Sequence, residues 1–297
     1  MANTWTALPH GRRQERRSEM ERKKVTPVDI QAMKKQGKKI TLLTAYDYPT
    51  AILEDRAGID IILVGDSLAM TVLGYENTLP VTMDEMISHT RAVARGAKFS
   101  MILGDMPFGS YNTSEKDAIY NASRFMKEGG ADAVKLEGGA TVKETVRAIV
   151  RAGIPVMGHI GLTPQMMSML GGFKVQGKDA QAAQKIIDDA LALEEAGAFS
   201  VLLEAVPDLI TKRVTERLRV PTIGVGAGKY CDGQGLVVHD ILGLFDRFTP
   251  KFSKRYVNLS ELMLKAFHSY IEEVAAVQFP TDAHSFHIDA KELNKLE

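Results

Sequence analysis

Short apolar runs alternate with longer amphipathic runs through most of the chain, and this alternation limits the possible folds. It extends from about Thr41 to Leu242 and repeats about eight times. The short runs are rich in Val, Ile and Leu with little polar alternation, as in strands that are covered on both faces. Alternating strands and helices are typical of a parallel α/β fold. Eight repeats favour a (β/α)8 barrel over an open, doubly wound sheet.

The boundaries of several elements can be predicted from the same pattern. In the segment 114–130, Ser114 is a suitable helix N-cap, and Gly129 or Gly130 is a suitable stop. A second helix is predicted within 178–198, ending at Gly197, and a third within 259–278. The third helix has an apolar stripe and could either close the barrel or dock on a neighbouring subunit. The eight predicted strands are 40–47, 59–66, 99–106, 132–138, 154–161, 199–206, 221–228 and 235–242.

Composition excludes several classes of protein. The 297 residues include 37 Lys plus Arg and 37 Asp plus Glu, so a nucleic-acid partner is not expected. No apolar run approaches the roughly 20 residues of a membrane helix. The single cysteine, Cys231, cannot form an internal disulfide, and we interpret it as structural. We expect a cytoplasmic protein in which residues 25–287 form one barrel domain, including the C-terminal helix, and 288–297 form a polar tail.

An excess of positive charge is concentrated at the N-terminus. Residues 1–24 contain seven Lys plus Arg and three Asp plus Glu, which leaves 30 basic and 34 acidic residues and a net charge of −4 for the rest. We expect this basic extension to be disordered. The sequence from Met20 onward reads as a natural start, so residues 1–19 are expected to be dispensable. A mitochondrial presequence and a nucleic-acid-binding arm are less favoured alternatives.

Polar residues stand at the ends of five predicted strands. They are Asp66, Asp105, Glu137, His159 and Glu204. In a barrel, the C-terminal ends of the strands meet on the face where active sites are built. A buried carboxylate is costly unless it is paired, protonated or bound to a metal, so several of them at one mouth indicate a cation site. The alternative for each residue alone is a cap on the following helix.

The carboxylates predict magnesium chemistry. Asp66, Asp105 and Glu137 offer the hard oxygen ligands that Mg²⁺ prefers. A 2-oxo acid could add its carboxylate and keto oxygens, and the metal would then stabilise the enolate that forms when the neighbouring carbon loses a proton. Lys135 should share a face with Glu137, because side chains alternate along a strand, and could hold a substrate oxygen. The alternative is a surface lysine.

Two further residues could move or position protons. Glu204 lies in the apolar run VLLEAVP, and apolar surroundings make a carboxyl a better proton carrier near neutral pH. The alternative is a structural carboxylate at the end of a strand, with its hydrogen bonds satisfied and no role in proton transfer. His159 could act as an acid or base, as a ligand, or by shaping the site through hydrogen bonds. The glycines of GVGAG lack the spacing of a dinucleotide fingerprint and better suit tight turns or close approach to substrate.

Several longer motifs resemble those of the ketopantoate hydroxymethyltransferase family. They are LLTAYDYPTA, ILVGDSLAMTVLGYENTLPVTMDEM, VKLEGG, GHIGLTPQ, GGFKVQG, GVGAG, DGQGLVVHD and DAHSFH. The similarity runs from about Val25 to His287. It implies a TIM barrel of the phosphoenolpyruvate/pyruvate type that self-associates as a homo-oligomer, usually a decamer. It also implies transfer of a hydroxymethyl group from 5,10-methylenetetrahydrofolate to 3-methyl-2-oxobutanoate, giving 2-dehydropantoate for pantothenate and coenzyme A biosynthesis.

The resemblance also implies roles for individual residues. Asp66, Asp105 and Glu137 match the family's Mg²⁺ ligands. The residues with which the family contacts its keto acid correspond to Asp66, Ser67, Asp105 and Lys135. Glu204 matches the proton acceptor. Only flanking positions depart from the pattern, such as Ala69, where glycine is expected.

Two other kinds of function fit parts of the sequence. A lyase or mutase on the same barrel is the nearest competing enzyme, but the lyases typically carry a cysteine on a catalytic loop, and Cys231 has no such setting. A non-catalytic scaffold that binds folate, or nucleic acid through the basic extension, is the alternative of a different class.

Overall fold

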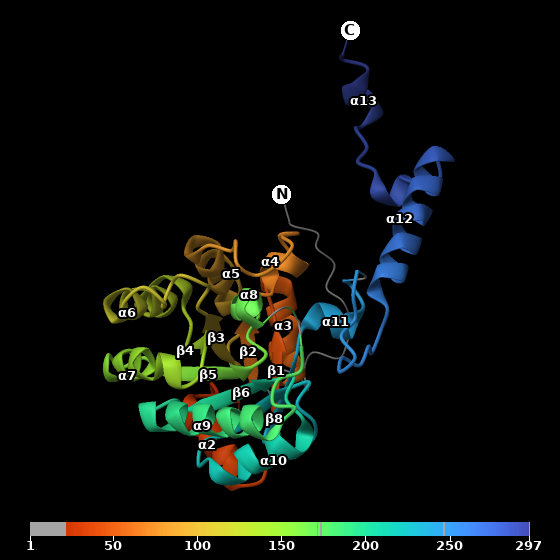
Figure 1. Cartoon of the computed structure of the whole chain (residues 1–297). Coiled ribbons are helices and arrows are strands. Elements are labelled where there is room, and N and C mark those ends of the chain that lie inside the picture. Colours follow the sequence, from red (N-terminus) through yellow and green to blue (C-terminus); the bar gives the residue numbers. More distant parts are fainter. Residues whose placement is uncertain (1–21, 171, 173, 246, 297) are drawn as a thin grey trace. The chain divides into compact units, whose positions relative to one another are not determined.

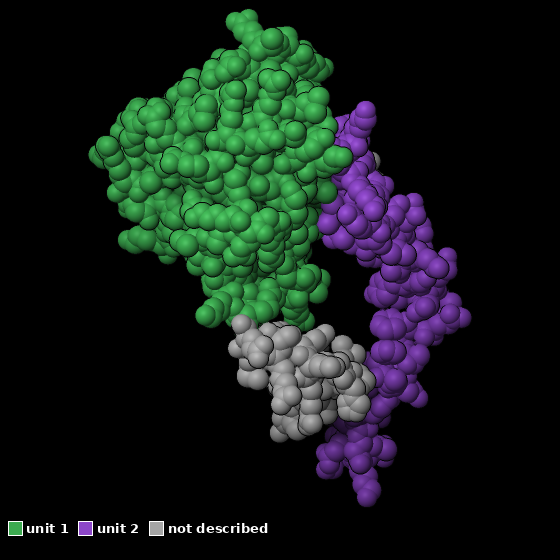
Figure 2. Space-filling view, turned by 90° about the horizontal axis from the view of Figure 1, so that it is seen from below, with its two compact units in different colours: residues 1–238 green, residues 239–297 purple. Residues whose placement is uncertain are grey.

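The computed structural model describes residues 22–170, 172, 174–245 and 247–296. The chain divides into two compact units, residues 1–238 and 239–297, which Figure 2 distinguishes by colour. This division falls inside the segment 25–287 that the sequence analysis assigns to one domain. Most of the predicted N-terminal extension lies outside the described residues, as do Gly171 and Phe173 of the GGFKVQG motif. No helix within the described ranges is long and apolar enough to cross a membrane.

The first unit contains a closed barrel of eight parallel strands (Figure 1). Each strand pairs with its neighbours in chain order, and the last pairs with the first. The predicted (β/α)8 fold is therefore confirmed. The strands are β1 (Ile40–Thr44), β2 (Ile61–Val64), β3 (Met101–Asp105), β4 (Ala133–Glu137), β5 (Val156–Gly161), β6 (Ser200–Glu204), β7 (Thr222–Val225) and β8 (Gly233–Leu236).

Helices connect the strands, and several of them begin at a residue whose side chain caps the helix. In the first unit they are α2 (Pro27–Lys35), α3 (Tyr48–Ala57), α4 (Leu68–Thr71), α5 (Met83–Gly96), α6 (Glu115–Arg124), the π-helical turn η1 (Phe125–Gly129), η2 (Ala140–Val142), α7 (Lys143–Arg151), η3 (Pro164–Met166), α8 (Met167–Leu170), α9 (Ala180–Ala196) and α10 (Asp208–Arg217). Ser114 accepts a hydrogen bond from the Asp117 amide, and Gly130 ends the segment in the left-handed region at φ 74°. Gly197 ends α9 at φ 98°, as predicted.

The eighth strand differs from the prediction. We expected it at 235–242, but β8 ends at Leu236, and Val238–Leu242 form the short helix α11. The strand is built around glycines because its neighbours leave no room for side chains. A Cβ on Gly233 would lie 2.6 Å from both the Ile40 carbonyl oxygen and Ile223 Cδ1. The bulky apolar run that follows these glycines therefore predicts the strand too late in the chain.

An apolar cluster fills the barrel interior below the strand ends. Its members come from α2 and from most strands: Ile30, Met33, Ile40, Leu42, Ile61, Leu63, Met101, Leu103, Ala133, Met157, Phe199, Leu202 and Ile223. Two residues further along β3, β5 and β6, on the same face as Leu103, Met157 and Leu202, the side chains become polar. The barrel core thus supports a polar layer at the C-terminal ends of the strands.

The last residues assigned to the basic extension contact the barrel. Arg22 donates to the Asp55 carbonyl at 2.6 Å and lies over the Phe99 ring. Lys24 forms an ion pair with Asp132 at 2.8 Å. These contacts place Arg22 and Lys24 with the barrel rather than with a free extension.

The second unit is helical. It contains α12 (Leu259–Ala275), the turn η4 (Asp282–His284) and α13 (Ala290–Leu293), and the predicted C-terminal helix is confirmed as α12. None of the residues of α12 is buried. Its apolar side chains, including Phe267, Tyr270 and Ile271, are exposed.

Candidate active site

The strand register brings the predicted site residues to one end of the barrel. Asp105 pairs with Lys135 across β3 and β4, and Glu137 pairs with His159 across β4 and β5. Asp105, Lys135, Glu137 and His159 are each at most 3% exposed. Glu204, at the end of β6, is half-buried, with 19% of its side chain exposed. The C-terminal ends of these strands therefore lie together, as predicted.

Asp66, Asp105 and Lys135 are linked directly. Lys135 Nζ lies 2.8 Å from Asp105 Oδ1. The other oxygen, Asp105 Oδ2, accepts a hydrogen bond from the Asp66 amide at 3.0 Å. Lys135 is thus a buried ion-pair partner, so the surface-lysine alternative is wrong. Ser67, the next residue after Asp66, lies 2.9 Å from the Tyr46 hydroxyl through its Oγ.

His159 stands between two carboxylates. Its Nδ1 lies 3.4 Å from Glu137 Oε1 and 3.4 Å from Lys135 Nζ. Its Nε2 lies 3.3 Å from Glu204 Oε2. The imidazole therefore connects Glu204 to the group formed by Glu137, Lys135 and Asp105.

Burial and mutual repulsion set the charge balance of the site. Burial, with repulsion from Asp105 and Glu137, raises the pKa of Asp66 well above its usual range. Burial lowers the pKa of Lys135, but attraction to Asp105, Glu137 and Asp66 outweighs it and raises that pKa overall. Burial and Lys135 likewise lower the pKa of His159, but its contacts with Glu137 and Glu204 outweigh both and raise it to about 9. All three shifts favour the protonated form, so the carboxylates of the site favour positive charge beside them.

The donor set suits a hard divalent cation, although the side chains are not arranged as a finished metal site. Asp66, Asp105 and Glu137 offer only carboxylate oxygens, which Mg²⁺ prefers. Glu137 Oε1 accepts no hydrogen bond from the described residues. In the described part of the chain, however, no three His, Cys, Asp or Glu side chains surround one point as metal ligands. Lys135 Nζ already contacts Asp105 Oδ1, so a metal that binds this oxygen would have to displace the ammonium.

Two further buried residues of this site, Gln165 and Tyr111, were not predicted from the sequence. Gln165 lies in η3, after β5, and donates to Asp66 Oδ2 at 2.9 Å. Tyr111 lies between β3 and α6, and its hydroxyl contacts Gln165 Oε1 at 2.6 Å. Both lie beyond the strand ends, on loops, so the strand-end pattern could not find them. The only signal in the sequence was the position of Gln165 in GHIGLTPQ, one of the motifs quoted above.

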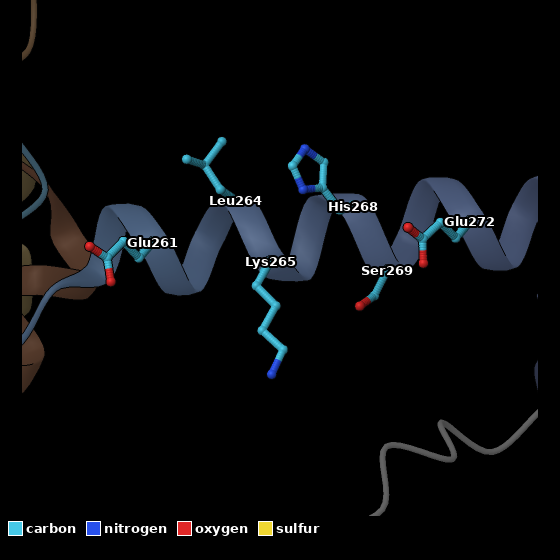
Figure 3. Close-up of a pocket in the computed structure, with 6 residues that line it drawn as sticks. All are labelled: Glu261, Leu264, Lys265, His268, Ser269 and Glu272. Atoms are coloured by element: carbon cyan, nitrogen blue, oxygen red, sulfur yellow. The ribbon is translucent and has the colours of Figure 1, made fainter.

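A hollow elsewhere on the molecule contains none of these residues. The residues that line it all lie on α12: Glu261, Leu264, Lys265, His268, Ser269 and Glu272. Figure 3 shows Leu264 and His268 on one side of the helix and Lys265 and Ser269 on the other. The hollow is therefore the open flank of a helix rather than an enclosed site.

Comparison with known proteins identifies the family. The family model described as ketopantoate hydroxymethyltransferase matches residues 24–282. The chain belongs to the ketopantoate hydroxymethyltransferase family. The 3-methyl-2-oxobutanoate hydroxymethyltransferase of Moorella thermoacetica is 59% identical over 266 residues, covering 90% of this chain and 99% of the relative. The protein of the same name from Carboxydothermus hydrogenoformans is 55% identical over 273 residues, covering 92% and 99%. The resemblance in the sequence motifs is thus confirmed, and with it the enzyme class of the hydroxymethyltransferases.

Solved structures support the fold. A 2,3-dimethylmalate lyase, described as a PEP mutase/isocitrate lyase superfamily member, matches 91% of this chain and 94% of its own with a TM-score of 0.57 and 13% identity. A phosphonopyruvate hydrolase solved with oxalate and Mg²⁺ matches 92% and 94% with a TM-score of 0.55 and 15% identity. At this identity the likeness concerns the barrel fold alone.

Proposed function

We propose that this hydroxymethyltransferase moves a one-carbon unit from 5,10-methylenetetrahydrofolate to 3-methyl-2-oxobutanoate and forms 2-dehydropantoate. The observation that carries the proposal is the buried cluster of Asp66, Asp105, Lys135 and Glu137, joined through His159 to Glu204. The relatives at 55–59% identity are named for the same keto acid. The net reaction consumes the keto acid, methylenetetrahydrofolate and water, and releases the hydroxymethylated acid and tetrahydrofolate.

The cationic and hydroxyl groups of the site would bind the keto acid. Lys135 is a buried ammonium whose charge is retained among carboxylates, so it can hold a substrate oxygen. Ser67 Oγ is a second donor beside Asp66. Asp66, Asp105 and Glu137 would hold Mg²⁺. When bound, the ion would supply Lewis-acid polarisation of the keto group, which acidifies the neighbouring C–H bond.

Glu204 is the proposed proton acceptor. Its carboxylate takes the proton from C3 of the keto acid, and the electron pair of that C–H bond delocalises as an enolate. The enolate carbon then forms the new C–C bond to the methylene carbon of the folate as the bond from that carbon to one folate nitrogen breaks. A water molecule supplies the hydroxyl group as the second C–N bond breaks, and the proton held by Glu204 and the remaining proton of the water go to the two folate nitrogens. His159, 3.3 Å from Glu204 Oε2, is placed to fix the orientation of this carboxylate.

Incubation of the full chain with keto acid, Mg²⁺ and methylenetetrahydrofolate tests the proposal. We expect 2-dehydropantoate and tetrahydrofolate in equal amounts. Turnover of phosphonopyruvate or of a 2-substituted malate, with none of the keto acid, would instead indicate the mutase or lyase alternative.

We also infer that copies of the chain self-associate in the cytoplasm as a homo-oligomer, with a decamer as the expected size. Large apolar side chains exposed along α12, including Phe267 and Ile271, support self-association. Light scattering of the purified protein gives the mass of the assembly, and a monomeric mass would contradict the inference.

A further inference from the structure

Gln165 contacts residues at the C-terminal ends of three strands, β2, β3 and β4. It is 3% exposed, and its amide Nε2 donates to Asp66 Oδ2 at 2.9 Å and to the Met106 carbonyl at 3.0 Å. Its backbone amide donates to Glu137 Oε2 at 3.0 Å. A single residue after β5 therefore holds one oxygen of each of two carboxylates that come from β2 and β4.

Tyr111 fixes the direction of these hydrogen bonds. The Glu137 backbone amide donates to the Tyr111 hydroxyl at 3.3 Å, and an amide N–H can only donate. The Tyr111 hydrogen is then free for Gln165 Oε1 at 2.6 Å. Because the Met106 carbonyl can only accept, the NH₂ group of Gln165 must face it and Asp66. Two independent partners thus determine which way the amide points.

We propose that Gln165 is a positioning residue that holds Asp66 and Glu137 ready to bind the divalent cation. The inference rests on the proposed function, because it assumes that these carboxylates bind a metal. Partners that orient the ligands of a metal typically change its affinity by about 10–100-fold. Gln165 acts through Asp66 and Glu137 and leaves free the oxygens with which they bind the metal, such as Glu137 Oε1.

A purely structural role is the competing explanation. Gln165 could serve only to fasten the loop that runs from β5 to α9. In that case its loss would lower the thermal midpoint and leave the metal affinity of the folded protein unchanged. Metal affinity therefore distinguishes the two roles more sharply than activity does.

The test compares Mn²⁺ binding to the full chain and three variants, measured by electron paramagnetic resonance without substrate. Gln165→Met keeps the length of the side chain and removes its hydrogen bonds. Tyr111→Phe removes the partner of Gln165 Oε1 and the acceptor of the Glu137 backbone amide, and it leaves the Gln165 side chain in place. Gln176→Met is the matched control, because Gln176 lies in the same loop and its side-chain Nε2 donates only to the Lys174 carbonyl among the described residues.

We expect Gln165→Met to weaken Mn²⁺ binding by about 10–100-fold. Tyr111→Phe should have a smaller effect, and Gln176→Met none. Saturating metal should restore most of the kcat of Gln165→Met, which shows that the loss lies in binding. Equal affinity in the parent protein and Gln165→Met would overturn the inference while leaving the proposed function intact. A parent protein that binds no Mn²⁺ would overturn the metal site and the inference with it.

Discussion

Glu204 is the residue on which proton transfer depends in this account. Its carboxylate is half-buried at the end of β6 and contacts His159 Nε2. Glu204→Gln keeps the shape of the side chain but cannot accept the proton, so turnover should fall by about 10²–10⁴-fold. Steady-state kinetics with saturating keto acid and folate measure this loss. Turnover close to that of the parent enzyme would remove Glu204 from this role.

His159 offers a matched pair of substitutions that separates its two nitrogens. Gln can place an amide near the position of Nε2, which faces Glu204, whereas Asn places it near Nδ1, which faces Glu137. If His159 orients Glu204, His159→Gln should retain more kcat than His159→Asn. The expected gap is about tenfold to a hundredfold, because a hydrogen bond to a charged group contributes about 1.5–3 kcal/mol. Equal losses of kcat in both variants would contradict this orientation role.

The sequence predicted the charged residues of the site but not the neutral residues Gln165 and Tyr111. Asp66, Asp105, Lys135, Glu137 and Glu204 stood out because charge at the end of an apolar strand is costly and therefore informative. Gln165 and Tyr111 carry no charge and lie on loops whose path through the barrel mouth no periodicity describes. Their contacts with Asp66 and Glu137 depend on tertiary structure alone.

The main difference between the predicted and the observed elements is the position of β8, and the glycines of this strand explain it. Seven strands overlap their predicted segments closely, because Val, Ile and Leu mark strands covered on both faces. The sequence of β8 is GQGL, since its neighbours leave no room at Gly233. Gly161, at the end of β5, meets a similar limit, because a Cβ there would lie 2.3 Å from the Glu204 carbonyl oxygen. Such packing limits are not visible in a single sequence.

Helix α3 carries a buried carboxyl with a clear effect on stability. Neither oxygen of Glu54 has a hydrogen-bond partner among the described residues. Burial, and to a smaller extent Asp47, raises the pKa of Glu54 from 4.5 to about 8. The folded protein therefore keeps this proton between about pH 4.5 and pH 8, where the unfolded chain has released it. The free energy of unfolding should fall as pH rises through this window.

Glu54→Gln isolates this contribution, because the amide does not titrate. Relative to the variant, the parent protein should lose about 1.4 kcal/mol of stability per pH unit across the window, with no further loss above about pH 8. Urea unfolding at several pH values measures the difference. A parallel pH dependence of the two proteins would show that Glu54 is ionised or paired when folded.

For the whole molecule, the net charge of zero combines two unlike parts. A basic N-terminal segment offsets a body with a net charge of −4, and four acidic residues of that body, Asp66, Asp105, Glu137 and Glu204, gather at one mouth of the barrel. The family model begins at residue 24, after most of the basic segment. Part of the excess of acidic residues outside the basic segment therefore belongs to the candidate active site and not to the surface.

Deletion of residues 1–19 tests whether the basic segment takes part in the function. Because the truncated chain retains Arg22 and Lys24, which contact the barrel, it should keep full kcat and KM for the keto acid and an unchanged thermal midpoint. Kinetics and calorimetry of the two forms provide the comparison. A marked loss of activity at equal stability would assign these residues a role in catalysis or folate binding.

Deuterium exchange at C3 of 3-methyl-2-oxobutanoate tests the central claim most directly, because it follows enolisation at this site without the folate. With Mg²⁺ in D₂O, the parent enzyme should exchange this hydrogen, as followed by proton NMR. Asp105→Ala removes a proposed metal ligand and the partner of Lys135, and it should abolish the enzyme-dependent exchange. Exchange at the parent rate in Asp105→Ala would contradict the assignment of the cluster as the site of enolisation.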